Sequence, residues 1–165
     1  MEAELQKRLL NKAGSLLSRR SYSRGEMRAK LAKFAESDDI EATLDGLEAL
    51  NLLNDAEYAY NFAASRIAQN GWGPIKVRHS LLRRHVAPDI VEGALERVRR
   101  ESGDEIVLRV YLDRHCSKTG LPRDRQGIQK LVNHLRRRGF GDALIFSTLR
   151  RVIPDAAWEY FESGD

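Results

Sequence analysis

Apolar residues in this 165-residue chain recur at intervals of three and four positions, the spacing that places side chains on one face of an α-helix. No stretch shows the strict alternation of apolar and polar residues that is typical of a half-buried β-strand. The pattern therefore predicts an all-α protein. The predicted helices span residues 2–20, 24–36, 38–51, 55–70, 74–86, 88–101, 104–117, 125–138 and 142–153, and a short helix is expected after residue 154.

Three sets of apolar residues keep one spacing, with gaps of four and then nine positions. The sets are Met27, Leu31 and Ile40; Val77, Leu81 and Ile90; and Leu131, Leu135 and Leu144. They lie 50 and then 54 residues apart. A period of about 50 residues indicates a repeat protein, in which each unit buries its apolar face on its neighbours. We therefore expect three tandem three-helix repeats, at residues 1–53, 54–102 and 103–165, that form an elongated, curved array.

Helix start signals stand at matching places in the repeats. Ser23 and Glu26 have the spacing of a capping box, in which each side chain accepts a hydrogen bond from an otherwise unpaired backbone N–H. In the second repeat Pro74 takes the first helical position, where a missing N–H does no harm. Asn54 opens the first helix of that repeat in the manner of a cap.

One arc of each middle helix is apolar on a helical wheel and predicts the core. The predicted core residues are Met27, Leu31, Ala32 and Ala35; Ile75, Val77, Leu81 and Leu82; and Ile128, Leu131, Val132 and Leu135. Arg28 and Arg78 also fall in this arc. We expect their aliphatic stems to pack there while each guanidinium pairs with an acid on the next helix.

The opposite arc carries a basic residue at one matching position in every repeat, namely Lys33, Arg83 and Arg137. In a regular array these would form a spaced basic row that suits a polyanionic partner. Basic residues are also common on outward helix faces for solubility alone, and the pattern favours neither interpretation. The net charge of +4 is only mildly basic. Residues 118–138 are strongly basic, whereas the tail from residue 154 is acidic.

The sequence contains no pattern that indicates catalysis, a cofactor or a metal. Cys116 is the single cysteine, and the four histidines are scattered along the chain. The segment 71–74 lacks the preceding strand and the Gly-Lys-Ser/Thr of a phosphate-binding loop. No apolar run approaches the ~20 residues of a membrane span, and the N-terminus is unlike a secretory signal. We therefore expect a cytoplasmic protein that is not an enzyme.

The motifs of the chain resemble those of the RecX family over nearly all 165 residues. The second repeat carries the likeness most clearly, in Gly71-Trp72-Gly73-Pro74, Ile75-Lys76-Val77-Arg78 and Leu81-Leu82-Arg83-Arg84. Segments 21–31, 49–55 and 62–66 and Arg137-Arg138-Gly139-Phe140 support it. The chain departs from the family at Asn51, where glycine is frequent, and at His85-Val86.

The resemblance implies a modulator of the bacterial recombinase RecA that lies on the RecA–DNA filament and inhibits its ATPase, recombinase and co-protease activities. No catalytic, cofactor-binding or metal-binding residue is implied. The expected partners are the RecA filament and DNA phosphates, without a membrane, and the protein is expected to be a monomer. The candidate filament-facing residues are Lys33, Lys76, Arg83, Arg84, Lys130, Arg136, Arg137 and Arg138.

Three other interpretations compete with this one, and an enzyme that uses cysteine or histidine is the last of them. A helix-turn-helix DNA-binding protein also contains three-helix units with a basic helix, and it would bind duplex DNA directly. No middle helix here has an N-terminus polar enough to contact base edges, which disfavours this alternative. A general α-helical scaffold would bind neither RecA nor DNA.

Overall fold

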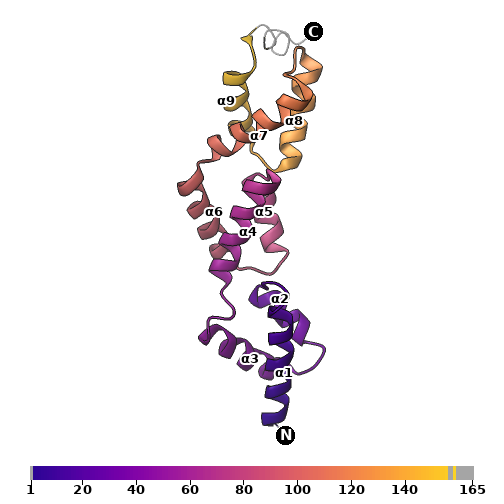
Figure 1. The fold of residues 1–165 in the computed structure, drawn as a ribbon, viewed down its shortest axis with the longest axis vertical. Helices are drawn as coiled ribbons and strands as arrows, with labels where there is room; N and C mark the ends of the chain where they lie inside the picture. The colour runs from indigo at the N-terminus through magenta and orange to yellow at the C-terminus, as the bar shows by residue number, and fades with distance from the viewer. Residues whose placement is uncertain (1, 156–157, 159–165) are drawn as a thin grey trace. The chain divides into compact units, whose positions relative to one another are not determined.

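The computed structural model describes residues 2–155 and residue 158. Every regular element in that part of the chain is an α-helix, which confirms the predicted all-α class (Figure 1). The helices are α1 (Glu2–Leu17), α2 (Arg24–Leu31), α3 (Ser37–Ala49), α4 (Asp55–Asn70), α5 (Pro74–Leu82), α6 (Pro88–Ser102), α7 (Asp104–Thr119), α8 (Arg125–Arg138) and α9 (Asp142–Val152). Apart from residues 155 and 158, the stretch of the predicted tail helix lies outside the described residues. Among the described helices, none combines the length and apolar character that a membrane span requires.

The chain forms two compact units. Unit 1 consists of Met1–Phe62 with Ser80–Ala94, and unit 2 consists of Ala63–His79 with Leu95–Asp165. The repeat boundaries at residues 53/54 and 102/103 stay a prediction.

In unit 1, helices α1, α2 and α3 enclose an apolar core. Its buried members are Leu9, Ala13, Tyr22, Met27, Leu31, Ile40, Leu44, Leu47 and Leu53. In unit 2, α7, α8 and α9 enclose a second core. Its buried members are Leu108, Leu112, Ile128, Leu131, Val132, Leu135, Phe140, Ile145, Leu149, Ile153 and Trp158. Burial of such aliphatic and aromatic side chains, at about 1.5–3 kcal/mol each, is the main term that stabilises both units.

The predicted core is confirmed at the first two positions of each apolar set, since Met27, Leu31, Val77, Leu81, Leu131 and Leu135 are all buried. It is wrong at Ala32, which is exposed, and at Ile75 and Leu82, which are 41% and 38% exposed. Ala32 and Leu82 lie where their helices end, so the helical wheel no longer describes the surroundings of their side chains.

Helices α2 and α5 are shorter than predicted, and α5 shows why. His85 adopts a left-handed conformation with φ of 58°, and the N–H of Val86 donates to the carbonyl of Leu81 at 3.3 Å. This is the hydrogen-bond pattern of a Schellman motif, which ends a helix. Gly139, with φ of 90°, ends α8 in the same way, and there Phe140 N–H donates to the carbonyl of Leu135.

The start of α5 and the end of α8 approach each other through backbone atoms within unit 2. The N–H of Gly73 donates to the carbonyl of Arg138 at 2.7 Å, and the N–H of Ile75 donates to the carbonyl of Gly139 at 3.1 Å. A Cβ on Gly73 would lie 2.3 Å from the Gly139 oxygen, and a Cβ on Gly139 would lie 2.4 Å from the backbone nitrogen of Lys76. Only glycine therefore fits at both positions.

Unit 1 repeats this contact between the start of α2 and the end of α5. The hydroxyl of Ser23 donates to the carbonyl of Arg84 at 2.5 Å. A Cβ on Gly25 would lie 2.2 Å from Cβ of His85, so glycine is required here as well. The same ends of successive middle helices thus meet twice in the chain.

Replacing Gly73 with alanine tests this close approach. We expect Gly73→Ala to lower the free energy of unfolding by about 2 kcal/mol or more, because the new methyl group meets backbone atoms that cannot yield locally. The measurement is urea unfolding followed by circular dichroism. The matched control is Gly93→Ala in α6, where a Cβ meets nothing within 4 Å, and where alanine should be neutral or stabilising by about 0.5–1 kcal/mol. Equal stability of the two variants would contradict the role assigned to Gly73.

Candidate functional site

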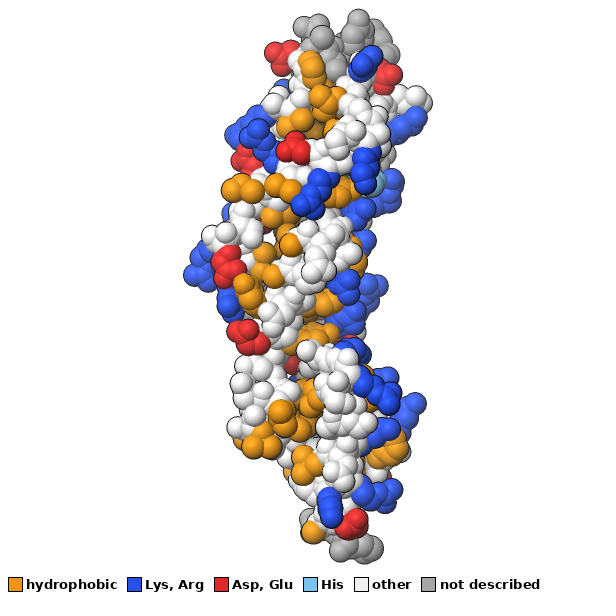
Figure 2. Space-filling view, viewed as in Figure 1, with side chains coloured by type: hydrophobic (Ala, Val, Ile, Leu, Met, Phe, Trp, Pro, Cys, Tyr) orange, Lys and Arg blue, Asp and Glu red, His pale blue; other side chains and the backbone are white. Residues whose placement is uncertain are grey.

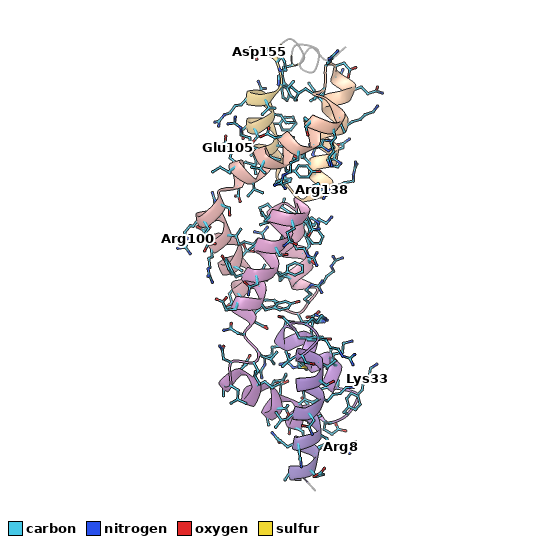
Figure 3. All side chains as sticks on the ribbon, in the orientation of Figure 1. Arg8, Lys33, Arg100, Glu105, Arg138 and Asp155 are labelled. Atoms are coloured by element: carbon cyan, nitrogen blue, oxygen red, sulfur yellow. The ribbon has the colours of Figure 1, made fainter. Side chains whose placement is uncertain are left out.

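The candidate basic residues divide between the two units. Unit 1 holds Lys33, Arg83 and Arg84, and unit 2 holds Lys76, Lys130, Arg136, Arg137 and Arg138. Figure 2 shows Lys and Arg side chains (blue) on the surface of both units. Lys33 and Arg83 lie in the turns that follow α2 and α5, rather than on the helices themselves. In Figure 3 the Lys33 side chain points away from the helices of its unit.

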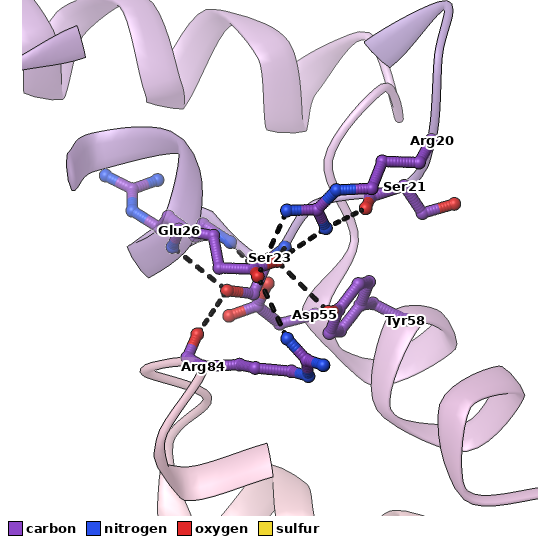
Figure 4. Close-up of polar contacts among 8 residues, drawn as sticks. Arg20, Ser21, Ser23, Glu26, Asp55, Tyr58 and Arg84 are labelled. Atoms are coloured by element: carbon purple, nitrogen blue, oxygen red, sulfur yellow. Dashed lines mark hydrogen bonds and ion pairs between the residues drawn. The ribbon is translucent and has the colours of Figure 1, made fainter. Parts of the chain in front are cut away.

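Arg84 is engaged inside unit 1. Its Nη1 donates to Oε1 of Glu26 at 3.3 Å (Figure 4). Its guanidinium lies 4.9 Å from the centre of the Phe62 ring on α4. Its carbonyl accepts the Ser23 hydroxyl. These contacts fix the backbone and the side chain of Arg84 within the fold.

Arg138 is engaged in an equivalent way inside unit 2. Its Nη1 donates to the carbonyl of Asn70 at 2.7 Å, and its guanidinium lies 5.2 Å from the centre of the Tyr111 ring on α7. Its carbonyl accepts the Gly73 N–H. Arg84 and Arg138 are 54 residues apart, and each is the second arginine of a pair that ends a middle helix. In both pairs the second arginine therefore stabilises the contact between helix ends.

Two further candidates have partners within unit 2. Arg136 forms a two-pronged ion pair with Asp142, with Nε–Oδ1 and Nη2–Oδ2 distances of 2.7 and 3.0 Å. The ammonium of Lys76 lies 4.5 Å from the centre of the Trp72 ring, and the guanidinium of Arg66 lies 5.4 Å from it. Trp72 thus packs against two cations of unit 2.

The other four candidates are exposed and have no ion pair within the described residues. They are Lys33, Arg83, Lys130 and Arg137. Arg83 and Arg137 are the first arginines of the two pairs. Each pair therefore combines one arginine that the fold holds with one that points to solvent.

Glu26 is the acceptor at the centre of the unit 1 contact, and its side chain is only 14% exposed. It accepts hydrogen bonds from Arg20, from Arg84, from Tyr58 and from the Ser23 N–H (Figure 4). The Ser23 hydroxyl accepts the Glu26 N–H at 3.0 Å, so the predicted capping box is confirmed.

The electrostatic environment of Glu26 follows from these contacts. Burial acts to raise its pKa, but the hydrogen bonds from Arg20, Ser23 and Tyr58 outweigh burial, so the pKa lies below its ordinary value. Burial and the neighbouring carboxylate raise the pKa of Tyr58 to about 12. Glu26 therefore stays ionised and Tyr58 stays protonated near neutral pH.

Arg24 and Arg28 tie α2 to α3. Arg28 pairs with Glu41 at 2.5 Å, which confirms the prediction that this arginine meets an acid on the next helix. Arg24 contacts Glu41, Asp45 and also Glu48. Hydrogen bonds from Arg28 and Arg24 lower the pKa of Glu41 to about 2. These acids neutralise basic charge near the start of α2.

Two histidines that are 19 residues apart in the sequence come together in unit 2. The rings of His115 on α7 and His134 on α8 are stacked, with their centres 4.7 Å apart and their planes 18° apart. Nε2 of His134 lies 2.6 Å from the Tyr111 hydroxyl. The sequence did not reveal this pairing, because it depends on how the two helices pack.

Metal ligation finds no support in the described part of the chain, where no group of three or more His, Cys, Asp or Glu side chains is placed to hold an ion. Burial, followed by the charge of Asp113, raises the pKa of the Cys116 thiol, which disfavours the nucleophilic thiolate.

Several known proteins that are similar to this chain carry the same name. The family model described as RecX, second three-helix domain, matches residues 54–95. The regulatory protein RecX of Prosthecochloris aestuarii is 35% identical over 148 residues, which cover 89% of this chain and 95% of the relative. The regulatory protein RecX of Thermus thermophilus is 39% identical over 126 residues, which cover 76% of this chain and 78% of the relative. The name of these relatives is that of a regulatory protein and not of an enzyme.

A solved structure shows the same fold. The crystal structure of RecX from Lactobacillus salivarius superimposes with a TM-score of 0.81 at 20% identity, covering 91% of this chain and 97% of that one.

Replacing Glu26 with glutamine tests the acceptor at the unit 1 contact. We expect Glu26→Gln to lower the free energy of unfolding at pH 7 by about 1–3 kcal/mol, because Arg20 and Arg84 lose their charged partner. The folded-state pKa of Glu26 is lowered, so its contribution is present above the ordinary value of 4.5 and is lost as pH falls through the folded pKa. The difference between the wild type and the variant should therefore shrink in acid.

The measurement is urea unfolding at a series of pH values. The control is Glu4→Gln, an exposed position on α1, which should change stability little at any pH. A deficit in Glu26→Gln that persists unchanged below the folded pKa would contradict an electrostatic role.

Proposed function

This chain belongs to the RecX family, and on that premise we propose that it binds the filament that the recombinase RecA forms on DNA and modulates RecA. We expect it to inhibit the ATPase, recombinase and co-protease activities of RecA. The setting is cytoplasmic DNA repair and recombination, including the SOS response. The protein acts as a monomer and not as an enzyme.

The proposed interface rests on one observation, namely that some exposed cations form no ion pair within the described residues. Lys33, Arg83, Lys130 and Arg137 expose full positive charges, whereas Arg84, Arg136 and Arg138 are engaged within the fold. An exposed cation can meet an acidic protein side chain or a DNA phosphate without first giving up an internal partner. We therefore narrow the proposed filament-facing set to these four residues.

Several contacts acting together are needed for such an interface. An exposed ion pair contributes only about 0.2–1 kcal/mol. A filament repeats its surface at a fixed spacing, so a chain of repeats can make the same weak contact more than once. Linked contacts of this kind reach an affinity that a single contact does not. This is why three repeats, each with a basic residue at the end of its middle helix, support binding to a filament.

Charge reversal at the two exposed arginines tests the proposal. We expect Arg83→Glu with Arg137→Glu to raise the concentration needed for half-inhibition of the RecA ATPase about tenfold, since each reversal replaces an attraction by a repulsion of about the same size. The measurement is DNA-dependent ATP hydrolysis by RecA with increasing amounts of the protein. Circular dichroism should be unchanged, because both side chains are exposed.

The matched control is Arg109→Glu on α7, which makes the same charge change at another exposed arginine. It should leave inhibition nearly unchanged. Equal inhibition by the wild type and the double variant would overturn the proposed interface. Tighter binding to bare duplex DNA than to RecA-coated single strands would instead favour a helix-turn-helix DNA-binding protein.

A further inference from the structure

A groove of about 400 Å³ lies in unit 2 between the end of α7, the loop at residues 120–122 and one face of α8. Its lining includes His115, Lys130, His134 and Arg137. The volume falls in the range of about 300–1,000 Å³ that is usual for small-molecule sites. The groove is therefore large enough for a ligand of nucleotide size.

The charged groups of the groove have one sign. Lys130 and Arg137 are seven residues apart on α8, which places them two turns apart on the same side of the helix. Both are exposed, and neither has an ion pair within the described residues. No carboxylate is among the described residues that line the groove. An anion that enters it meets two cations and no repelling charge.

The rings of the groove are held in place by their neighbours. His134 stacks on His115 and is joined to the Tyr111 hydroxyl, while Arg138 covers the Tyr111 ring. Burial lowers the pKa of His134, and the charges of His115 and Arg138 lower it further. His134 is therefore neutral near pH 7. A fixed pair of flat rings is a suitable surface for another aromatic ring to stack on.

We propose that this groove binds a nucleotide, with its phosphate between Lys130 and Arg137 and its base against the His115–His134 ring pair. Arginine and lysine are the usual partners of phosphate groups. Stacking of a base on an aromatic side chain is worth about 1–3 kcal/mol and does not depend on the identity of the base. Free nucleotides and the nucleotides of a single strand share this chemistry. The inference does not rest on the proposed function, because the chain binds this ligand without RecA.

Binding is tested with the full chain alone, in the absence of RecA. The probes are fluorescently labelled ADP and a labelled short oligothymidylate, both followed by fluorescence anisotropy. We expect Lys130→Ala with Arg137→Ala to weaken binding about tenfold or more, the effect of losing charged hydrogen bonds to phosphate. His115→Leu should weaken binding of the same probe while leaving competition by inorganic pyrophosphate unchanged, since it removes part of the stacking surface only.

The matched control is Lys7→Ala with Arg109→Ala, which removes two exposed cations that lie outside the groove and outside the proposed filament-facing set. Binding of ADP that depends on the groove residues supports a site for free nucleotides. Binding of the oligothymidylate alone, with the same dependence, supports a site for a nucleotide within a strand. The proposal is overturned if neither probe binds at millimolar concentration, or if the control weakens binding as much as the groove variant does.

Discussion

The structure depends on a contact between the start of one middle helix and the end of the next, made so closely that no Cβ fits at Gly25, Gly73 or Gly139. Gly73 donates its N–H to the carbonyl of Arg138, and the Ser23 hydroxyl donates to the carbonyl of Arg84. Each contact satisfies a carbonyl at a helix end that the helix itself leaves unpaired. Each also brings a second arginine onto an aromatic ring of the preceding helix, Phe62 in unit 1 and Tyr111 in unit 2. The contact thus decides which arginines are engaged within the fold and which stay exposed.

Local features of the fold could be predicted from the sequence because their causes lie within a few residues. The capping box of Ser23 and Glu26 spans one helical turn, and the apolar positions of the middle helices follow the helical period. The pattern was wrong at Ala32, Ile75 and Leu82, which lie at helix ends. Near a helix end the surroundings of a side chain depend on where the chain goes next, as at the left-handed His85 that follows α5, and periodicity no longer predicts burial.

The candidate site was only partly predictable from the sequence. Contacts between residues that are distant in sequence decide which basic side chains have partners within the fold and which stay exposed. Arg83 and Arg84 are adjacent and chemically identical, yet only Arg84 meets Glu26, which is 58 residues away. His115 and His134 look scattered along the chain and are stacked in space. No periodicity encodes such pairings. For the Arg84 contact the sequence holds one indirect signal, namely glycine at position 25, where the start of α2 meets His85.

Because only the second arginine of each pair has partners within the fold, a substitution at the first arginine can change the surface without loss of the fold. A substitution at Arg84 removes a partner of a carboxylate that is only 14% exposed, so it affects stability first. A substitution at Arg83 removes a charge that no described residue of the chain uses, so its effect on stability should be small. The same reasoning separates Arg138 from Arg137. At the interface proposed above, binding strength can therefore be tuned at the first arginine of each pair, while the second arginine preserves the contact between helix ends.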